Sequence, residues 1–179
     1  MQSLIMDKIL KYQKLYIDLA SRIAQMSYAK RLQVGAVAVK GDKILATGWN
    51  GMPTGWDNNC EYREYMKGDA GGWLGVEEIL EGWPYEDKTD PEYPDRRYNL
   101  KTRPEVLHAE ANLLTKLARS TESCEGSDLY VTHAPCIDCA KLIYQCGIAR
   151  VFYLNDYRSD DGVKFLTQCS ITVHKLPTD

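Results

Sequence analysis

The chain has 179 residues, of which 44% are hydrophobic and 26% charged, a composition typical of a globular domain and not of a disordered or fibrous chain. Its net charge of −3 excludes the basic field that drives non-specific nucleic-acid binding, so no polynucleotide partner is expected. Six cysteines are too sparse for a disulfide scaffold, and the charges spread through the N-terminal residues argue against a secretory signal or a membrane span; we therefore expect a cytoplasmic protein without membrane contact.

Two regular patterns open the chain. Apolar residues recur every three or four positions from Ile5 to Met26, which predicts an amphipathic helix packed on a sheet, with a short coiled coil as the alternative. Two β-rich runs, Val34–Val39 and Lys43–Trp49, then flank a short glycine-containing segment. This arrangement predicts a β-hairpin.

Residues 50–104 change character, with many glycines and prolines and no sustained period. We expect an irregular insertion at about 60–104, with one short helix near Gly75–Leu80. The segment "EEILEGWPYEDKTDPEYPD" holds eight acidic residues against one lysine, and such a run is usually a solvated face.

Regular structure is predicted again from His108 to the end of the chain. Helices alternating with strands indicate an α/β fold in which one mixed sheet is covered on both faces. We expect a single domain over residues 1–179. The predicted elements are a helix from His108 to about Ser120, a strand Ser127–Thr132, a helix Pro135–Cys146, a strand Arg150–Leu154, a helix Asp161–Gln168 and a strand Ile171–Leu176.

Two predicted helix starts carry metal-binding side chains. His108 and Glu110 are two residues apart, about 200° around an ideal helix, so they can share only a site that lies beyond the helix end. Cys136 and Cys139 share the first turn of the next helix, where the dipole and free N–H groups favour thiolates.

Two thiolates and one imidazole suit zinc, and three protein ligands leave a fourth position for water, as in catalytic zinc sites. Alone, a histidine at a helix start is usually a cap or a core residue, and a C-x-x-C pair indicates zinc, redox chemistry or chance. Together, His-x-Glu and Pro-Cys-x-x-Cys match the pattern of zinc-dependent nucleobase deaminases. Glu110 would then act as a general acid–base beside the water.

Four stretches resemble the cytidine deaminase superfamily, and within it the deoxycytidylate (dCMP) deaminases, including those of bacteriophages: "VGAVAVKGDKILATGWNGMP", "HAEANLL", "GSDLYVTHAPCIDCAKLIYQCGI" and "NDY". The resemblance implies a three-layer α/β/α sandwich with a central mixed five-stranded sheet. It also implies zinc-dependent hydrolytic deamination of dCMP to dUMP, which supplies dUMP for dTMP synthesis.

The same resemblance implies roles for residues around the metal. Asn50 would bind the sugar, and the backbone N–H of Ala109 would bind O2 of the base. Tyr157 is the better candidate for the 5′-phosphate. Cationic candidates are Arg158, Lys30 and Arg31, although Lys30 and Arg31 could equally be solvated loop charges.

Regulation is a further implication. Many dCMP deaminases are homohexamers activated by dCTP and inhibited by dTTP, bound with Mg²⁺. The loop containing Asn50 and Gly51 would help hold the effector, and Arg119 matches an arginine tied to control in phage relatives, or it simply caps a helix. A phage-encoded enzyme would act in the host cytoplasm.

One zinc per chain is expected. Some phage relatives hold a second, structural zinc, but residues 50–104 here contain no histidine and a single cysteine, Cys60. Cys124, Cys146 and Cys169 are interpreted as buried small apolar residues.

Two rival functions remain open. One is a deaminase of polynucleotides, acting on transfer RNA or on single-stranded DNA, against which the acidic charge argues. The other is a non-catalytic zinc module, which would have no use for Glu110 as a free carboxylate.

Overall fold

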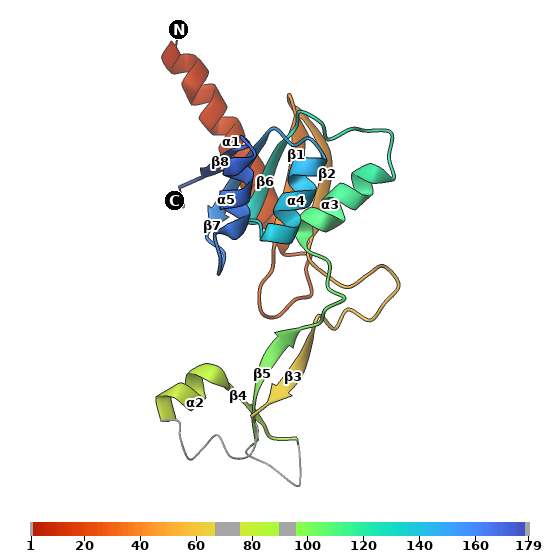
Figure 1. The fold of residues 1–179 in the computed structure, drawn as a ribbon, viewed down its shortest axis with the longest axis vertical. Helices are drawn as coiled ribbons and strands as arrows, with labels where there is room; N and C mark the ends of the chain where they lie inside the picture. Colours follow the sequence, from red (N-terminus) through yellow and green to blue (C-terminus); the bar gives the residue numbers. More distant parts are fainter. Residues whose placement is uncertain (1, 67–75, 90–95, 178–179) are drawn as a thin grey trace.

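The computed structural model describes residues 2–66, 76–89 and 96–177, which form one sheet-centred body and a smaller sheet that stands away from it (Figure 1). In chain order the elements are α1 (Gln2–Ala24), β1 (Gly35–Lys40), β2 (Lys43–Trp49), β3 (Glu61–Tyr65), α2 (Val76–Gly82), β4 (Tyr85–Asp87), β5 (Arg96–Thr102), α3 (Ala109–Ala118), β6 (Asp128–His133), α4 (Ile137–Gln145), β7 (Arg150–Asn155), α5 (Asp161–Gln168) and β8 (Thr172–Lys175).

The main sheet has five strands in the order β2-β1-β6-β7-β8. β1 pairs antiparallel with β2 and β6, whereas β7 pairs parallel with β6 and β8, so the expected mixed five-stranded sheet is confirmed. The predicted hairpin is also present, and Gly41 turns it with φ of 65°, a conformation that costs a glycine little.

Alternating side chains send each strand's residues to opposite faces of this sheet. One face packs against α1 through aromatic and aliphatic residues, with the rings of Tyr130 and Phe152 stacked 4.7 Å apart. The opposite face packs against α3, α4 and α5 and carries the larger core cluster, which includes Ala36, Ala38, Leu129, Val131 and Val151. The expected three-layer sandwich is therefore confirmed.

The α1 stripe is only partly buried. Tyr16 and Ile17 are buried against the sheet, whereas Ile9 and Tyr12 remain exposed because the N-terminal half of α1 projects beyond the sheet (Figure 1). Within the described residues, no helix is both long enough and apolar enough to cross a bilayer.

Close backbone contacts at glycines set how near two helices approach the sheet. A Cβ on Gly35 would lie 2.0 Å from the carbonyl oxygen of Ala20 on α1, and a Cβ on Gly48 would lie 2.3 Å from that of Ala109 on α3. A side chain at Gly48 would therefore push away the start of α3, which carries His108.

The expectation of an irregular insertion at 60–104 is wrong for the described residues, where β3, β5 and β4 form an antiparallel three-stranded sheet. Its strands are mostly polar and lack the alternation of apolar and polar residues from which a strand can be predicted. Polar contacts hold it together instead: the buried carboxylate of Asp87 accepts hydrogen bonds from Arg63, Tyr65 and Thr89, and the Arg96 guanidinium lies 4.3 Å from the centroid of the Tyr65 ring.

Smaller differences concern boundaries and cysteines. The short helix of the insertion is Val76–Gly82, and Gly75, predicted to begin it, lies outside the described residues. Cys124, Cys146 and Cys169 are half-buried, not fully buried as expected, because they lie near the ends of elements at the margin of the core.

Candidate metal centre and its cavity

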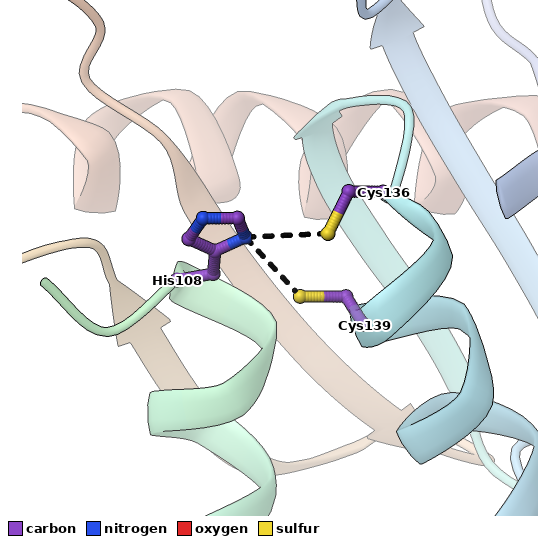
Figure 2. Close-up of side chains that lie close together, drawn as sticks. All are labelled: His108, Cys136 and Cys139. Carbon is purple, nitrogen blue, oxygen red and sulfur yellow. Dashed lines mark hydrogen bonds between the residues drawn. The ribbon is translucent and has the colours of Figure 1, made fainter. Parts of the chain in front are cut away.

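His108 and Cys136 both lie directly before the first turn of a helix. His108 caps α3 in an extended conformation, and its carbonyl oxygen accepts a hydrogen bond from the N–H of Asn112. Cys136 caps α4 in the same way, and its carbonyl oxygen accepts from the N–H of Ala140. Figure 2 shows the three side chains of His108, Cys136 and Cys139 converging between the two helix starts.

The geometry of this group fits a zinc ion. Nδ1 of His108 lies 3.5 Å from Sγ of Cys136 and 3.4 Å from Sγ of Cys139, and all the ligand atoms lie within 4.8 Å of one another. Zinc bonds of about 2.3 Å to sulfur and 2.0 to 2.1 Å to nitrogen, at a tetrahedral angle, separate such ligand atoms by about 3.5 Å. Two thiolates and an imidazole are also donors that zinc prefers.

Electrostatics in the cluster favour a cation. A hydrogen bond from Cys139 lowers the pKa of the Cys136 thiol to about 4, while the same pairing with Cys136 raises the pKa of Cys139 far above its usual range. The hydrogen bond to Cys136 raises the pKa of His108. One thiolate forms readily and the second is opposed by the first, so a divalent cation is the natural stabiliser of both.

Glu110 lies beside the cluster and is buried, with 4% of its surface exposed. Burial raises its pKa, because removing a carboxylate from water disfavours the charged form. A buried carboxyl whose pKa is raised exchanges protons more readily near neutral pH than an exposed one, which suits a general acid–base.

A cavity of about 420 Å³ opens onto this cluster. Its wall includes His108, Ala109, Glu110 and Cys136 at the two helix starts. Four further residues that the sequence singled out also line it: Arg31, Asn50, Tyr157 and Arg158. The structure thus brings the His-Cys-Cys group, the buried Glu110 and two arginines to one cavity.

The cations of the cavity come from two separate loops. Arg31 follows α1 and donates a hydrogen bond from Nη1 to Oγ1 of Thr102, 3.0 Å away. Arg158 follows β7, and its guanidinium lies 5.3 Å from the centroid of the Tyr157 ring. The neighbouring Lys30 is exposed and is not part of the cavity wall.

Asn50 lies in the cavity wall, and its side chain also holds the neighbouring backbone of Leu32 and Val34 in place. Its Oδ1 accepts from the N–H of Val34 and its Nδ2 donates to the carbonyl oxygen of Leu32, both at 2.8 Å. The side chain is 8% exposed, so its orientation is fixed by these two backbone contacts. An amide retains one further donor and one further acceptor site for a ligand.

Gly51 and Arg119 lie outside the described part of the cavity wall. Gly51 forms an isolated bridge with Leu107, the residue before His108, through hydrogen bonds of 3.0 and 2.9 Å. Arg119 is the exposed C-cap of α3, at the opposite end of that helix from His108. A cation there suits the helix dipole.

Sequence reasoning missed four polar residues of the cavity wall: Glu61, Thr102, His133 and Asp156. His133 ends β6 and Asp156 follows β7. Both could have been inferred from the parallel pairing of these two strands, since their carboxyl ends meet at one edge of the sheet. Glu61 and Thr102 belong to the insertion, and no local pattern links them to a site near His108.

Comparisons with known proteins agree with this arrangement. Residues 10–155 match the family model described as the cytidine and deoxycytidylate deaminase zinc-binding region. The deoxycytidylate deaminase of Enterobacteria phage T4 is 34% identical over 153 residues, covering 79% of this chain and 76% of the phage protein. That of Mycobacterium phage D29 is 34% identical over 140 residues, covering 77% and 90% of the two chains.

Among solved structures, the dCMP deaminase of cyanophage S-TIM5 in complex with dCMP and dUMP is similar, with a TM-score of 0.70 and 36% identity, over 93% of this chain and 97% of the other. A His-Cys-Cys cluster beside a buried glutamate, on a sheet of this order, defines a zinc-type hydrolytic site. The chain belongs to the family of zinc-binding cytidine and deoxycytidylate deaminases.

Proposed function

We propose that this protein catalyses the hydrolytic deamination of dCMP to dUMP with release of ammonia. The observation that carries the proposal is that one cavity joins the His108, Cys136 and Cys139 group and Glu110 to two arginines. A single nucleotide could therefore place its base beside Glu110 and its phosphate beside the arginines. The similar cyanophage structure, which holds dCMP and dUMP, supports the same substrate.

His108, Cys136 and Cys139 would hold one zinc ion per chain, and that ion would lower the pKa of a water bound to it to about 7. Glu110 accepts a proton from the attacking water and delivers it to N3 of the cytosine as C4 is attacked. Glu110 then takes the proton of the new C4 hydroxyl and delivers it to the amine. The C4–N bond breaks as the C4=O bond forms, so that water and dCMP give dUMP and ammonia. Its burial keeps the proton in this exchange and out of bulk solvent.

The remaining wall residues orient the nucleotide. The N–H of Ala109, the first residue of α3, has no partner within its helix and would donate a hydrogen bond to O2 of the base. Asn50 contributes a fixed amide toward the sugar. Arg31, Tyr157 and Arg158 supply positive charge and a hydroxyl for the 5′-phosphate.

Allosteric control by dCTP as activator and dTTP as inhibitor, with Mg²⁺, is part of the same proposal. It is supported by the Gly51–Leu107 bridge, which ties the Asn50–Gly51 loop to the residue before His108. An effector bound to this loop would therefore be linked to His108 through the backbone hydrogen bonds between Gly51 and Leu107. Arg119 is a candidate contact for the effector phosphates. A homohexamer acting in the cytoplasm, that of the host if the gene is viral, completes the proposal.

Ammonia release from dCMP, deoxycytidine, dCTP and a cytosine-containing oligonucleotide tests the function. For purified zinc-loaded protein, kcat/KM for dCMP should be at least about 10-fold higher than for deoxycytidine. Deoxycytidine lacks the phosphate, and each hydrogen bond to a charged group contributes a factor of about 10 or more. Deamination of the oligonucleotide alone would refute the proposal. Adding dCTP or dTTP with Mg²⁺ to the dCMP assay tests the control.

A further inference from the structure

Glu61 is a buried acid in the wall of the cavity that the proposed reaction does not use. It is the first residue of β3 and is 5% exposed. It lies in the same cavity wall as His108 and Glu110. A carboxylate buried to this extent needs hydrogen-bond donors, since burying one without partners is strongly unfavourable.

Within the described part of the chain, one of the two carboxylate oxygens of Glu61 accepts hydrogen bonds and the other does not. Oε1 accepts hydrogen bonds from the backbone N–H groups of Lys30 and Arg31, at 3.0 and 3.2 Å. In residues 2–66, 76–89 and 96–177, Oε2 accepts no such hydrogen bond. Oε2 is also not fully enclosed by protein atoms. Since Glu61 lines the cavity and its Oε1 is already used, Oε2 is the carboxylate oxygen left for a ligand bound there.

The surroundings of Glu61 join the insertion to the loop that carries Arg31. Glu61 is the register partner of Thr102 on β5, and Oγ1 of Thr102 accepts a hydrogen bond from the Arg31 guanidinium. In the described residues Arg31 forms no ion pair with Glu61, so its charge remains available to a phosphate. Glu61 and Thr102 of the insertion sheet thus form part of the cavity wall.

The chemistry of dCMP restricts what Oε2 can bind. A carboxylate repels the 5′-phosphate, and it needs a donor. The nucleotide offers only two donors, the exocyclic amine and the 3′-hydroxyl. The amine must face Glu110 and the metal group in order to react, which leaves the 3′-hydroxyl.

We propose that Glu61 is a specificity-determining residue that accepts a hydrogen bond from the free 3′-hydroxyl of the substrate, an inference that rests on the proposed dCMP reaction. A nucleotide within a polynucleotide has no 3′-hydroxyl and brings a phosphodiester to the same place. The carboxylate would repel that negative charge. Glu61 therefore restricts the cavity to mononucleotides.

The test compares substrates that differ only at the 3′-position: dCMP, 2′,3′-dideoxycytidine 5′-monophosphate and deoxycytidine 3′,5′-bisphosphate. For the wild-type protein, kcat/KM for both analogues should fall at least about 10-fold below that for dCMP, the effect of losing a hydrogen bond to a charged group. Equal efficiency with the dideoxy analogue overturns the proposal.

The variant Glu61→Gln keeps an oxygen for the Lys30 and Arg31 N–H groups but removes the charge. It should lower kcat/KM for dCMP by about 10-fold and leave that for the dideoxy analogue unchanged. The ratio of kcat/KM for the bisphosphate to that for dCMP should rise by a similar factor. Equal losses on dCMP and the dideoxy analogue would instead show that Glu61 only braces the loop, and the proposal would fail.

Glu64→Gln is the matched control, because Glu64 lies on the same strand but is exposed and pairs with Lys101 at 3.2 Å. It should leave all three substrates unchanged. Binding of dUMP and its 2′,3′-dideoxy analogue to wild-type protein, measured by calorimetry, supplies a readout without turnover. Absence of ammonia release from dCMP refutes the proposed function, whereas equal affinities for these two products refute the Glu61 subsite.

Discussion

Gly162 on α5 lies directly against the carbonyl oxygen of Pro135, the residue before the metal-side Cys136. A Cβ at position 162 would lie 2.0 Å from that oxygen and 2.8 Å from the carbonyl carbon of Cys136. α5 thus fixes the position of the α4 start through a backbone contact that only glycine allows.

Gly162→Ala should therefore destabilise the fold and lower its zinc content. Alanine gains about 1 kcal/mol in helix propensity, but overpacking costs about 1 to 3 kcal/mol and would displace Cys136. Thermal unfolding and metal analysis measure the two effects. Gly82→Ala, with no atom within 4 Å of the added Cβ, is the control. An unchanged zinc content in Gly162→Ala would contradict the positioning role.

Glu110→Gln should lower the turnover rate strongly while leaving zinc and dCMP binding intact. Removing a general acid–base costs about 100- to 10,000-fold in rate, whereas the isosteric amide fits the same buried space. The expected result is a loss in kcat with near-normal zinc content and dCMP affinity, measured by steady-state kinetics and calorimetry. Turnover that survives the substitution would show that another group moves the proton.

Cys139→Ser should remove the metal. Serine is a poor zinc ligand, so the stoichiometry should fall from about one zinc per chain toward zero, as should the activity. Cys169→Ser, at the C-cap of α5 and remote from the cluster, should retain the metal. A wild-type stoichiometry near two would contradict the single-site expectation.

Arg158→Gln should impair the phosphate site alone. KM for dCMP should rise at least about 10-fold, because a charged hydrogen bond to the phosphate is lost, while the kinetics with deoxycytidine stay unchanged. Lys30→Gln is the control, since Lys30 is exposed and outside the cavity wall. If both nucleotide and nucleoside suffer equally, Arg158 has a structural role.

Asp87 should make the insertion sheet sensitive to acid. Hydrogen bonds from Thr89, Tyr65 and Arg63 hold the pKa of this carboxyl well below its usual range. A lowered folded-state pKa stabilises the fold above the ordinary pKa of an aspartate, and the stabilisation is lost as the pH falls through the folded value. The protection factors of residues 61–65 and 96–102 against deuterium exchange, each taken relative to the intrinsic exchange rate at that pH, should therefore fall in acid.

Asp87→Asn should show high uptake by these strands already at neutral pH, and its difference from wild type should shrink in acid. Asp42→Asn, in the exposed hairpin turn, is the control and should match wild type. Equal protection of wild type and Asp87→Asn at neutral pH would contradict this account.

The sequence predicted the metal group because its ligands sit in short local motifs, and it predicted β1 and β2 because a glycine turn separates two clear apolar runs. It failed at β3 and β5, whose strands "EYREY" and "RRYNLKT" are stabilised by ion pairs and ring contacts in place of a buried face. The sequence did not predict Glu61 as a cavity residue, because its partners Lys30 and Arg31 are about 30 positions away and only the folded chain brings them together.

The parallel pairing of β6 and β7 brings His133 opposite Asn155, so the loops that follow both strands open at one edge of the sheet. The antiparallel β1 places the Gly41 turn at the other edge, next to the turn at Gly126 that precedes β6. A dye, a surface anchor or a fused partner attached at Asp42 would therefore lie away from the cavity that His108 and Glu110 line. Immobilised or labelled forms of this protein can be built from that turn.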